Sequence, residues 1–103
     1  MNIEERVQVA ILSKYYGKML TERQQDILNM YVDNNLSLAE VSAELGISRQ
    51  AVKDALDNSM SALKNIEEKL HFISRDDNIK HTIEENETLD MITKIQLIAL
   101  LED

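Results

Sequence analysis

Proline and cysteine are both absent from this chain of 103 residues, and glycine occurs only twice, at Gly17 and Gly46. Because proline and glycine are the strongest helix breakers, their scarcity favours long helices joined by short turns. The lack of cysteine excludes a disulfide framework and a zinc site of the usual finger type. The sequence has no run of roughly 18 apolar residues, and no basic segment followed by an apolar one at its N-terminus. We therefore expect a cytoplasmic protein with no membrane segment.

The usual sequence patterns of catalysis are absent as well. Without cysteine, a glycine-rich loop or a nucleophile elbow, nothing in the sequence positions a reaction. The two histidines, His71 and His81, stand ten residues apart with two aspartates between them, and this spacing matches no metal-ligand motif such as HExxH. We expect no enzyme, no bound cofactor and no metal site.

The apolar residues, 44% of the chain, recur mostly at spacings of three and four, so the sequence predicts an all-α fold. A first helix is predicted over residues 3–16, and its inner face is predicted to contain Ile3, Val7, Ala10, Ile11 and Tyr15. Thr21 and Gln24 form the pattern of a capping box, which predicts a second helix from there to about residue 32.

The stretch from Leu36 to Leu56, "LSLAEVSAELGISRQAVKDAL", has the pattern of a helix-turn-helix. A second capping box, Ser37 with Glu40, opens a short helix that ends at Gly46, where positive φ would suit glycine. Ser48 is a natural N-cap for the next helix, whose apolar pattern continues to about residue 71. The apolar and small residues that such a motif needs at its contacts are all present: Val41, Ser42, Leu45, Gly46, Ile47, Val52 and Ala55.

In a helix-turn-helix, the first turn of the second helix faces the bases of the major groove. The exposed side chains predicted there, our candidate nucleic-acid-binding residues, are Ser48, Arg49, Gln50 and Lys53. Arginine can pair with guanine and glutamine with adenine, while serine and lysine can hold phosphates. The next turn carries Asp54 and Asp57 where a tight DNA binder would have bases, so we expect modest affinity.

The run from Leu20 to Phe72 resembles the YlxM-like family of small bacterial proteins, through "LTERQQ", "SLAEVSAELGISRQAV" and "EEKLH". The preceding "YYGKML" extends the resemblance toward Asn2. More distantly, the run is similar to the C-terminal domain of bacterial sigma factors that reads an upstream promoter element. The resemblance implies a sigma-like helix-turn-helix and a link to the signal recognition particle pathway, because such genes typically neighbour those of the particle's GTPase and its receptor.

The chain departs from this family in two places. One is "DNS" at residues 57–59, where the family often has a basic pair. The other is the tail beyond Ser74, which matches no family pattern by inspection. The resemblance therefore covers roughly the first 70 residues.

The net charge of -8 is concentrated in the last quarter of the chain, where residues 76–103 contain eight acids and two bases. Residues 1–36 and 37–75 each have a net charge of only -1, so the helix-turn-helix itself is nearly neutral. The stretch "HTIEENET", residues 81–88, has the pattern of a loop or loose helix. Three roles remain open for the acidic segment 76–90. It is a solvated surface with no binding role, it covers the recognition helix, or it attracts a basic partner. We expect a domain over residues 1–73, followed by this acidic segment and an apolar helix, with Thr88 as its cap, over 74–103.

Surplus apolar surface points to a partner chain. The last helix, "LDMITKIQLIALL", is apolar on more than one face, so it needs cover from the domain or from a second copy. A short heptad seam that could pair with a symmetry mate or fold back on the first helix is formed by Leu56, Leu63, Ile66, Leu70 and Ile73. We expect a homodimer, which would present two recognition helices to DNA.

Two functions remain open from the sequence. The first is a DNA-binding regulatory protein that could take part in the signal recognition particle pathway. The alternative is a protein-interaction module that docks on the particle or its receptor without reading DNA.

Overall fold

The computed structural model describes residues 1–102, which form six α-helices and contain no strand. The helices are α1 (Ile3–Tyr16), α2 (Glu22–Leu28), α3 (Leu38–Leu45), α4 (Arg49–Leu70), α5 (Phe72–Glu85) and α6 (Met91–Ala99). A 3-10 turn, η1 (Gly17–Met19), follows α1, and a π-helical turn, η2 (Asn29–Asp33), continues from α2. The expectation of an all-α helix-turn-helix bundle with a long recognition helix is confirmed. Within residues 1–102, no helix is long and apolar enough to cross a membrane.

The chain divides into two compact units between Leu70 and His71. This division lies three residues before the boundary that the sequence suggested. His71 adopts a left-handed conformation with φ of 58°, which ends the regular path of α4 immediately before α5 begins. The first unit contains α1 to α4, and the second contains α5 and α6.

Side-chain caps begin the helices of the first unit where the sequence predicted them. The Thr21 hydroxyl accepts a hydrogen bond from the Gln24 N–H at 3.2 Å, and the Gln24 side chain accepts one from the Thr21 N–H at 3.0 Å. Ser37 and Glu40 make the same reciprocal pair at the start of α3, at 3.0 and 3.2 Å. Both predicted capping boxes are confirmed, and each satisfies two backbone N–H groups that a helix start leaves unpaired.

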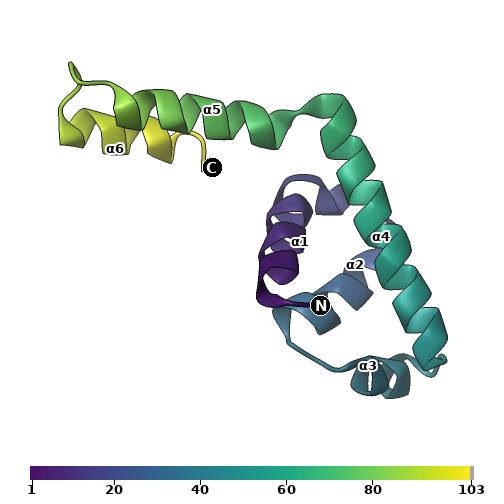
Figure 1. Ribbon diagram of the computed structural model, residues 1–103. Helices are drawn as coiled ribbons and strands as arrows, with labels where there is room; N and C mark the ends of the chain where they lie inside the picture. Colours follow the sequence, from purple (N-terminus) through teal and green to yellow (C-terminus); the bar gives the residue numbers. More distant parts are fainter. Residues whose placement is uncertain (103) are drawn as a thin grey trace. The chain divides into compact units, whose positions relative to one another are not determined.

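The core of the first unit forms where α1, α2 and α3 pack along one side of α4 (Figure 1). Ser59 is the one buried polar residue among those described, and its hydroxyl donates to the Ala55 carbonyl at 2.7 Å. The buried apolar residues come from each of the four helices and from the turn after α1: Val9, Leu12, Tyr16, Leu20, Ile27, Leu28, Val41, Val52, Leu56 and Leu63.

The predicted inner face of α1 is wrong. Val9, Leu12 and Tyr16 are buried, whereas Ile3, Val7, Ile11 and Tyr15, which we call the α1 stripe, are exposed. Both sets recur at helical spacing, so periodicity alone could not choose between them. Tertiary contacts choose: the buried Tyr16 hydroxyl donates to Glu67 of α4 at 2.5 Å.

A second contact fixes the other end of α1. The Arg6 guanidinium donates to the Tyr31 carbonyl at 2.9 Å and lies 4.9 Å from the centre of the Tyr31 ring. A cation over an aromatic face is attracted by the ring quadrupole. Together with the Tyr16 contact, it holds α1 in the rotation that leaves the α1 stripe outside.

The second unit is a hairpin of α5 and α6 lying side by side (Figure 1). The stretch 81–88, predicted as a loop or loose helix, is divided: residues 81–85 belong to the 14-residue helix α5, and residues 86–88 are not helical. The predicted Thr88 cap is wrong: the Asp90 carboxylate caps α6 by accepting from the Thr93 N–H at 2.6 Å. The Lys94 ammonium crosses the hairpin and donates to the Glu84 carbonyl at 2.8 Å.

Neither α5 nor α6 contains a buried residue. The positions of α6 that are partly covered are Thr93, Lys94 and Ile98, whereas its outer positions are almost all apolar. We call this outer surface the α6 face, and it consists of Met91, Ile92, Ile95, Leu97 and Leu100.

Candidate nucleic-acid interface

The turn between α3 and α4 is set by Gly46, whose φ of 67° lies in the left-handed region, as the sequence predicted. Its N–H donates to the Ser42 carbonyl at 2.9 Å, which closes the last turn of α3. A Cβ placed on Gly46 would meet no atom within 4 Å. Glycine is therefore favoured here by its backbone freedom and not by lack of space.

Ser42 and two buried valines fix the path of the chain after this turn. The Ser42 hydroxyl donates to the Ile47 carbonyl at 2.5 Å, and the Ile47 N–H donates to the Ser42 carbonyl at 3.2 Å. Val41 of α3 and Val52 of α4 are both fully buried. The start of α4 is therefore held by the hydrogen bonds between Ser42 and Ile47 and by the close packing of Val41 and Val52.

All four candidate residues lie on the exposed side of the first turn of α4 and just before it. The Ser48 hydroxyl accepts a hydrogen bond from the Ala51 N–H at 3.0 Å, so Ser48 is the N-cap of α4, as predicted. Its own O–H remains able to donate to an outside acceptor. The positive end of the helix dipole lies at the same place, which favours a nearby anion.

Two of the candidates are engaged by acids one turn further along α4. The Gln50 amide donates to the Asp54 carboxylate at 2.8 Å, and the Lys53 ammonium lies 3.0 Å from the Asp57 carboxylate. The hydrogen bond and the charge of Asp57 raise the pKa of Lys53 above its ordinary value of 10.5, with Asp54 adding to the effect. Lys53 is therefore cationic at neutral pH, but its charge is partly neutralised where a phosphate would approach.

Arg49 differs from these neighbours. Its side chain is exposed, and its guanidinium makes no hydrogen bond or ion pair with any other residue between 1 and 102. Arg49 is therefore the candidate whose charge and donors are fully available. The sequence identified both acids, but not that their spacing of four residues would engage Gln50 and Lys53.

The geometry is that of a helix-turn-helix protein: a short helix, a left-handed glycine turn and a capped second helix with an exposed first turn. The model of the UPF0122 family, the YlxM/p13-like helix-turn-helix proteins, matches residues 3–101. The chain belongs to this family. The match includes α5 and α6, so the expectation that the tail beyond Ser74 fits no family pattern is corrected.

Individual relatives agree with the family assignment. The chain is 32% identical to the UPF0122 protein YofM of Lactococcus lactis over 108 aligned positions, which cover 100% of this chain and 97% of YofM. It is 39% identical to a UPF0122 protein of Clostridium kluyveri over 82% of this chain and 72% of that protein. It is 40% identical to a UPF0122 protein of Desulforamulus reducens, where 71% of this chain spans only 62% of the relative.

Proposed function

We propose that this protein is a non-catalytic regulator of transcription in the cytoplasm, which binds DNA through the first turn of α4. The observation that carries the proposal is Arg49: an exposed, unpaired guanidinium at the N-terminus of a helix whose entry angle is fixed by Gly46 and Ser42. The family is described as one of helix-turn-helix proteins, which supports a nucleic-acid partner at a general level.

Each candidate residue has a distinct task in this proposal. Arg49 donates its two parallel N–H groups to the O6 and N7 of a guanine. Gln50 exchanges its hydrogen bond with Asp54 for one with an adenine, and Lys53 exchanges Asp57 for a phosphate oxygen. Ser48 donates to a phosphate beside the helix start. Exposed pairs four residues apart are weak, so breaking the Gln50–Asp54 and Lys53–Asp57 interactions costs little free energy. The affinity for DNA is nevertheless lower than that of a basic surface without such pairs.

The test is a titration of the purified protein onto random-sequence and promoter-derived duplexes at low salt. We expect Arg49→Ala to weaken binding by roughly tenfold or more, since one bidentate base contact contributes about 1–3 kcal/mol. Lys64→Ala is the matched control, because Lys64 is an exposed cation on the same helix, about four turns away. Indistinguishable binding curves for the two variants would contradict the proposal that the first turn of α4 contacts the bases.

A second candidate function is docking on the signal recognition particle or its receptor without reading DNA. The engagement of Gln50 and Lys53 by acids favours it, because it leaves Arg49 as the one fully available reading group of the four. The experiment is a pull-down from a bacterial lysate with and without nuclease. Retention of particle or receptor subunits after nuclease treatment supports docking, while loss of every retained partner with the nucleic acid contradicts it.

We further propose that the protein is a homodimer in which a second copy covers the α6 face. The chain exposes apolar residues on two surfaces, the α1 stripe and the α6 face. The α6 face lies in a stretch, residues 91–101, that contains no acid and only one base. A second copy therefore supplies apolar surface of matching extent with little charge to desolvate.

Sedimentation analysis of two variants tests this assembly. Ile95→Asp places a carboxylate in the α6 face and should give a monomer. Asn78→Asp adds the same charge at an exposed position of α5 and should leave the dimer intact. A wild-type chain that remains monomeric at high concentration would exclude the second copy as the cover.

A further inference from the structure

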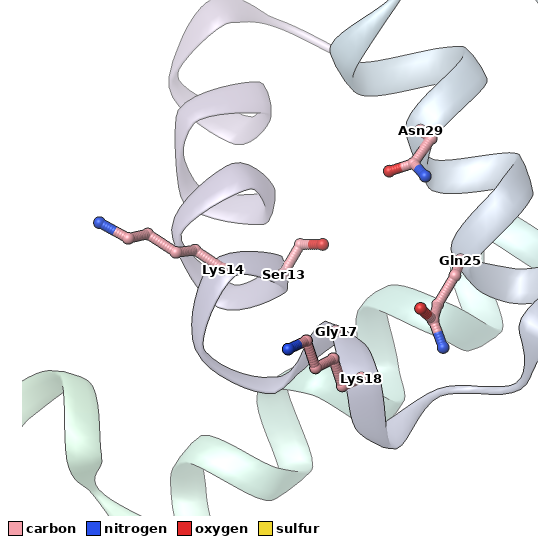
Figure 2. Close-up of a pocket in the computed structure, with 6 residues that line it drawn as sticks. All are labelled: Ser13, Lys14, Gly17, Lys18, Gln25 and Asn29. Carbon is pink, nitrogen blue, oxygen red and sulfur yellow. The ribbon is translucent and has the colours of Figure 1, made fainter. Parts of the chain in front are cut away.

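A polar cleft lies in the first unit, between the end of α1, η1 and α2. Its volume is about 180 Å³, and Figure 2 shows the side chains around it. The lining consists of Ser13, Lys14, Gly17, Lys18, Gln25 and Asn29. No function discussed above uses any of these residues.

Hydrogen-bond donors approach the cleft from both helices. The Ser13 hydroxyl points into it from α1 and the Asn29 amide from η2, at the end of α2 (Figure 2). Neither side chain forms a hydrogen bond with another residue between 1 and 102, so both are free to donate. The Gln25 amide is held at the edge, where it donates to the Leu20 carbonyl at 3.0 Å.

Gly17 keeps the space for the Ser13 hydroxyl. It has an ordinary helical φ of -56°, so its backbone does not require glycine. A Cβ at this position, however, would lie 2.9 Å from the Ser13 Oγ. Any larger residue would therefore have to displace the hydroxyl from its present place. Glycine at position 17 therefore leaves the Ser13 hydroxyl in place as a donor and leaves the cleft open.

Among the residues that line the cleft, the charged ones are both lysines, Lys14 and Lys18. Residues 6–21 form the longest stretch without an acid, and they include Arg6, Lys14 and Lys18. Neither lysine pairs with a carboxylate of residues 1–102, in contrast to Lys53 with Asp57. Lys18 lies along the edge of the cleft, whereas the Lys14 side chain points away from it (Figure 2). Both are exposed and flexible, and rotation about side-chain bonds brings Lys14 into range of a bound anion.

We propose that this cleft binds a backbone phosphate of a nucleic-acid strand. Phosphate oxygens accept from hydroxyl, amide and ammonium groups, which are the donors found here, and cations add most of the attraction. The proposal rests on the nucleic-acid partner proposed above but not on the reading turn. The cleft adjoins Tyr16, which contacts Glu67, eighteen residues beyond Arg49 on α4. That separation is about 27 Å along the helix, so the cleft is a second, independent contact.

The test compares two double variants in titrations of a random-sequence duplex and a single strand over a range of salt concentrations. Lys14→Gln with Lys18→Gln should weaken binding roughly tenfold at low salt and reduce the salt slope by about 1–2, because each lysine neutralises at most one phosphate. Lys64→Gln with Lys80→Gln removes the same charge from exposed positions elsewhere and should have a much smaller effect. Equal effects of the two variants on affinity and slope would overturn the proposal.

A second pair of variants separates the cleft from general charge. Asn29→Asp places a carboxylate in the cleft and should weaken binding severalfold, whereas Asn78→Asp in α5 adds the same charge elsewhere and should not. Calorimetry with inorganic phosphate tests the other source of this chemistry. Binding of free phosphate without any binding of either polynucleotide would assign the cleft to a small anion and contradict the proposal.

The outcome for the cleft is distinguishable from that for the reading turn. Loss of binding in the cleft variants but not in Arg49→Ala supports the cleft and removes the reading role of Arg49. Loss of binding in Arg49→Ala but not in the cleft variants supports the reading role of Arg49 and contradicts the cleft proposal. Circular dichroism should show the same helical content for all these variants, because none of the substituted side chains is buried.

Discussion

The two units of this protein are both built from helices but differ in what they bury. In the first, each helix contributes fully covered side chains, among them Val9, Ile27, Val41 and Leu63. In the second, no residue of α5 or α6 is buried, and Ile92 and Ile95 of α6 are 71% and 62% exposed. The first unit has a buried core that can hold a site in place, whereas the second exposes an apolar surface, which we propose a second copy covers.

The largest expected effect distinguishes the cores of the two units. Leu63→Ala, at a position with no exposure, should lower the free energy of unfolding by about 2–5 kcal/mol. Ile95→Ala should change it by less than about 0.5 kcal/mol when the chain is dilute enough to be monomeric. Urea unfolding followed by circular dichroism measures both. A comparable loss for Ile95→Ala would mean that α6 belongs to the cooperative core.

The next effect is at the turn of the first unit. Gly46→Ala should cost about 1–2 kcal/mol, because alanine resists a φ of 67°. Since a Cβ there meets nothing within 4 Å, the loss is entirely conformational. Gly46→Asn is the matched variant and should lose less, because asparagine tolerates the left-handed region better. The same unfolding experiment applies, and an equal loss for both substitutions would point to a steric cause instead.

A smaller effect compares helix starts in the two units. Ser37→Ala removes one half of the α3 capping box and should cost about 1 kcal/mol. Thr88→Ala should cost less, because Asp90, not Thr88, caps α6. Thermal unfolding of the two variants provides the measurement. The comparison fails if Thr88→Ala is the more damaging change.

The smallest effect is the response of α6 to acid. The hydrogen bond from the Thr93 N–H lowers the pKa of Asp90 below its ordinary value of 3.8. The cap therefore stabilises α6 above that ordinary pKa, and its contribution is lost as the pH falls through the lower, folded value. Amide NMR signals of α6 should broaden or shift in that acid range, and those of Asp90→Asn should not. Identical titrations of the two proteins would exclude the carboxylate as the cause.

Local signals in the sequence were sufficient for most of the first unit. The capping boxes at Thr21 and Ser37, the left-handed Gly46 and the N-cap at Ser48 all involve residues within three or four positions of one another. Such interactions depend little on the rest of the fold. The exposure of Arg49 followed from the same short-range pattern.

The errors in the sequence analysis involve choices that only tertiary packing makes. Both stripes of α1 are apolar, and the contact between Tyr16 and Glu67 selects the buried one. Residues 81–88 have too few apolar side chains to predict a stable helix. The helix α5 nevertheless continues to Glu85, with Ile83 partly covered and α6 packed alongside. The cleft beside Gly17 is lined by residues from several elements, so no local sequence pattern predicts it.

The central claim is that nucleic acid meets the first turn of α4, and the most direct measurement is an NMR titration of the labelled chain with duplex DNA. We predict that the amide signals of Ser48, Arg49, Gln50 and Lys53 shift together and early, while those of α6 stay in place. Shifts confined to α5 and α6, or an unchanged spectrum at saturating duplex, would contradict the account.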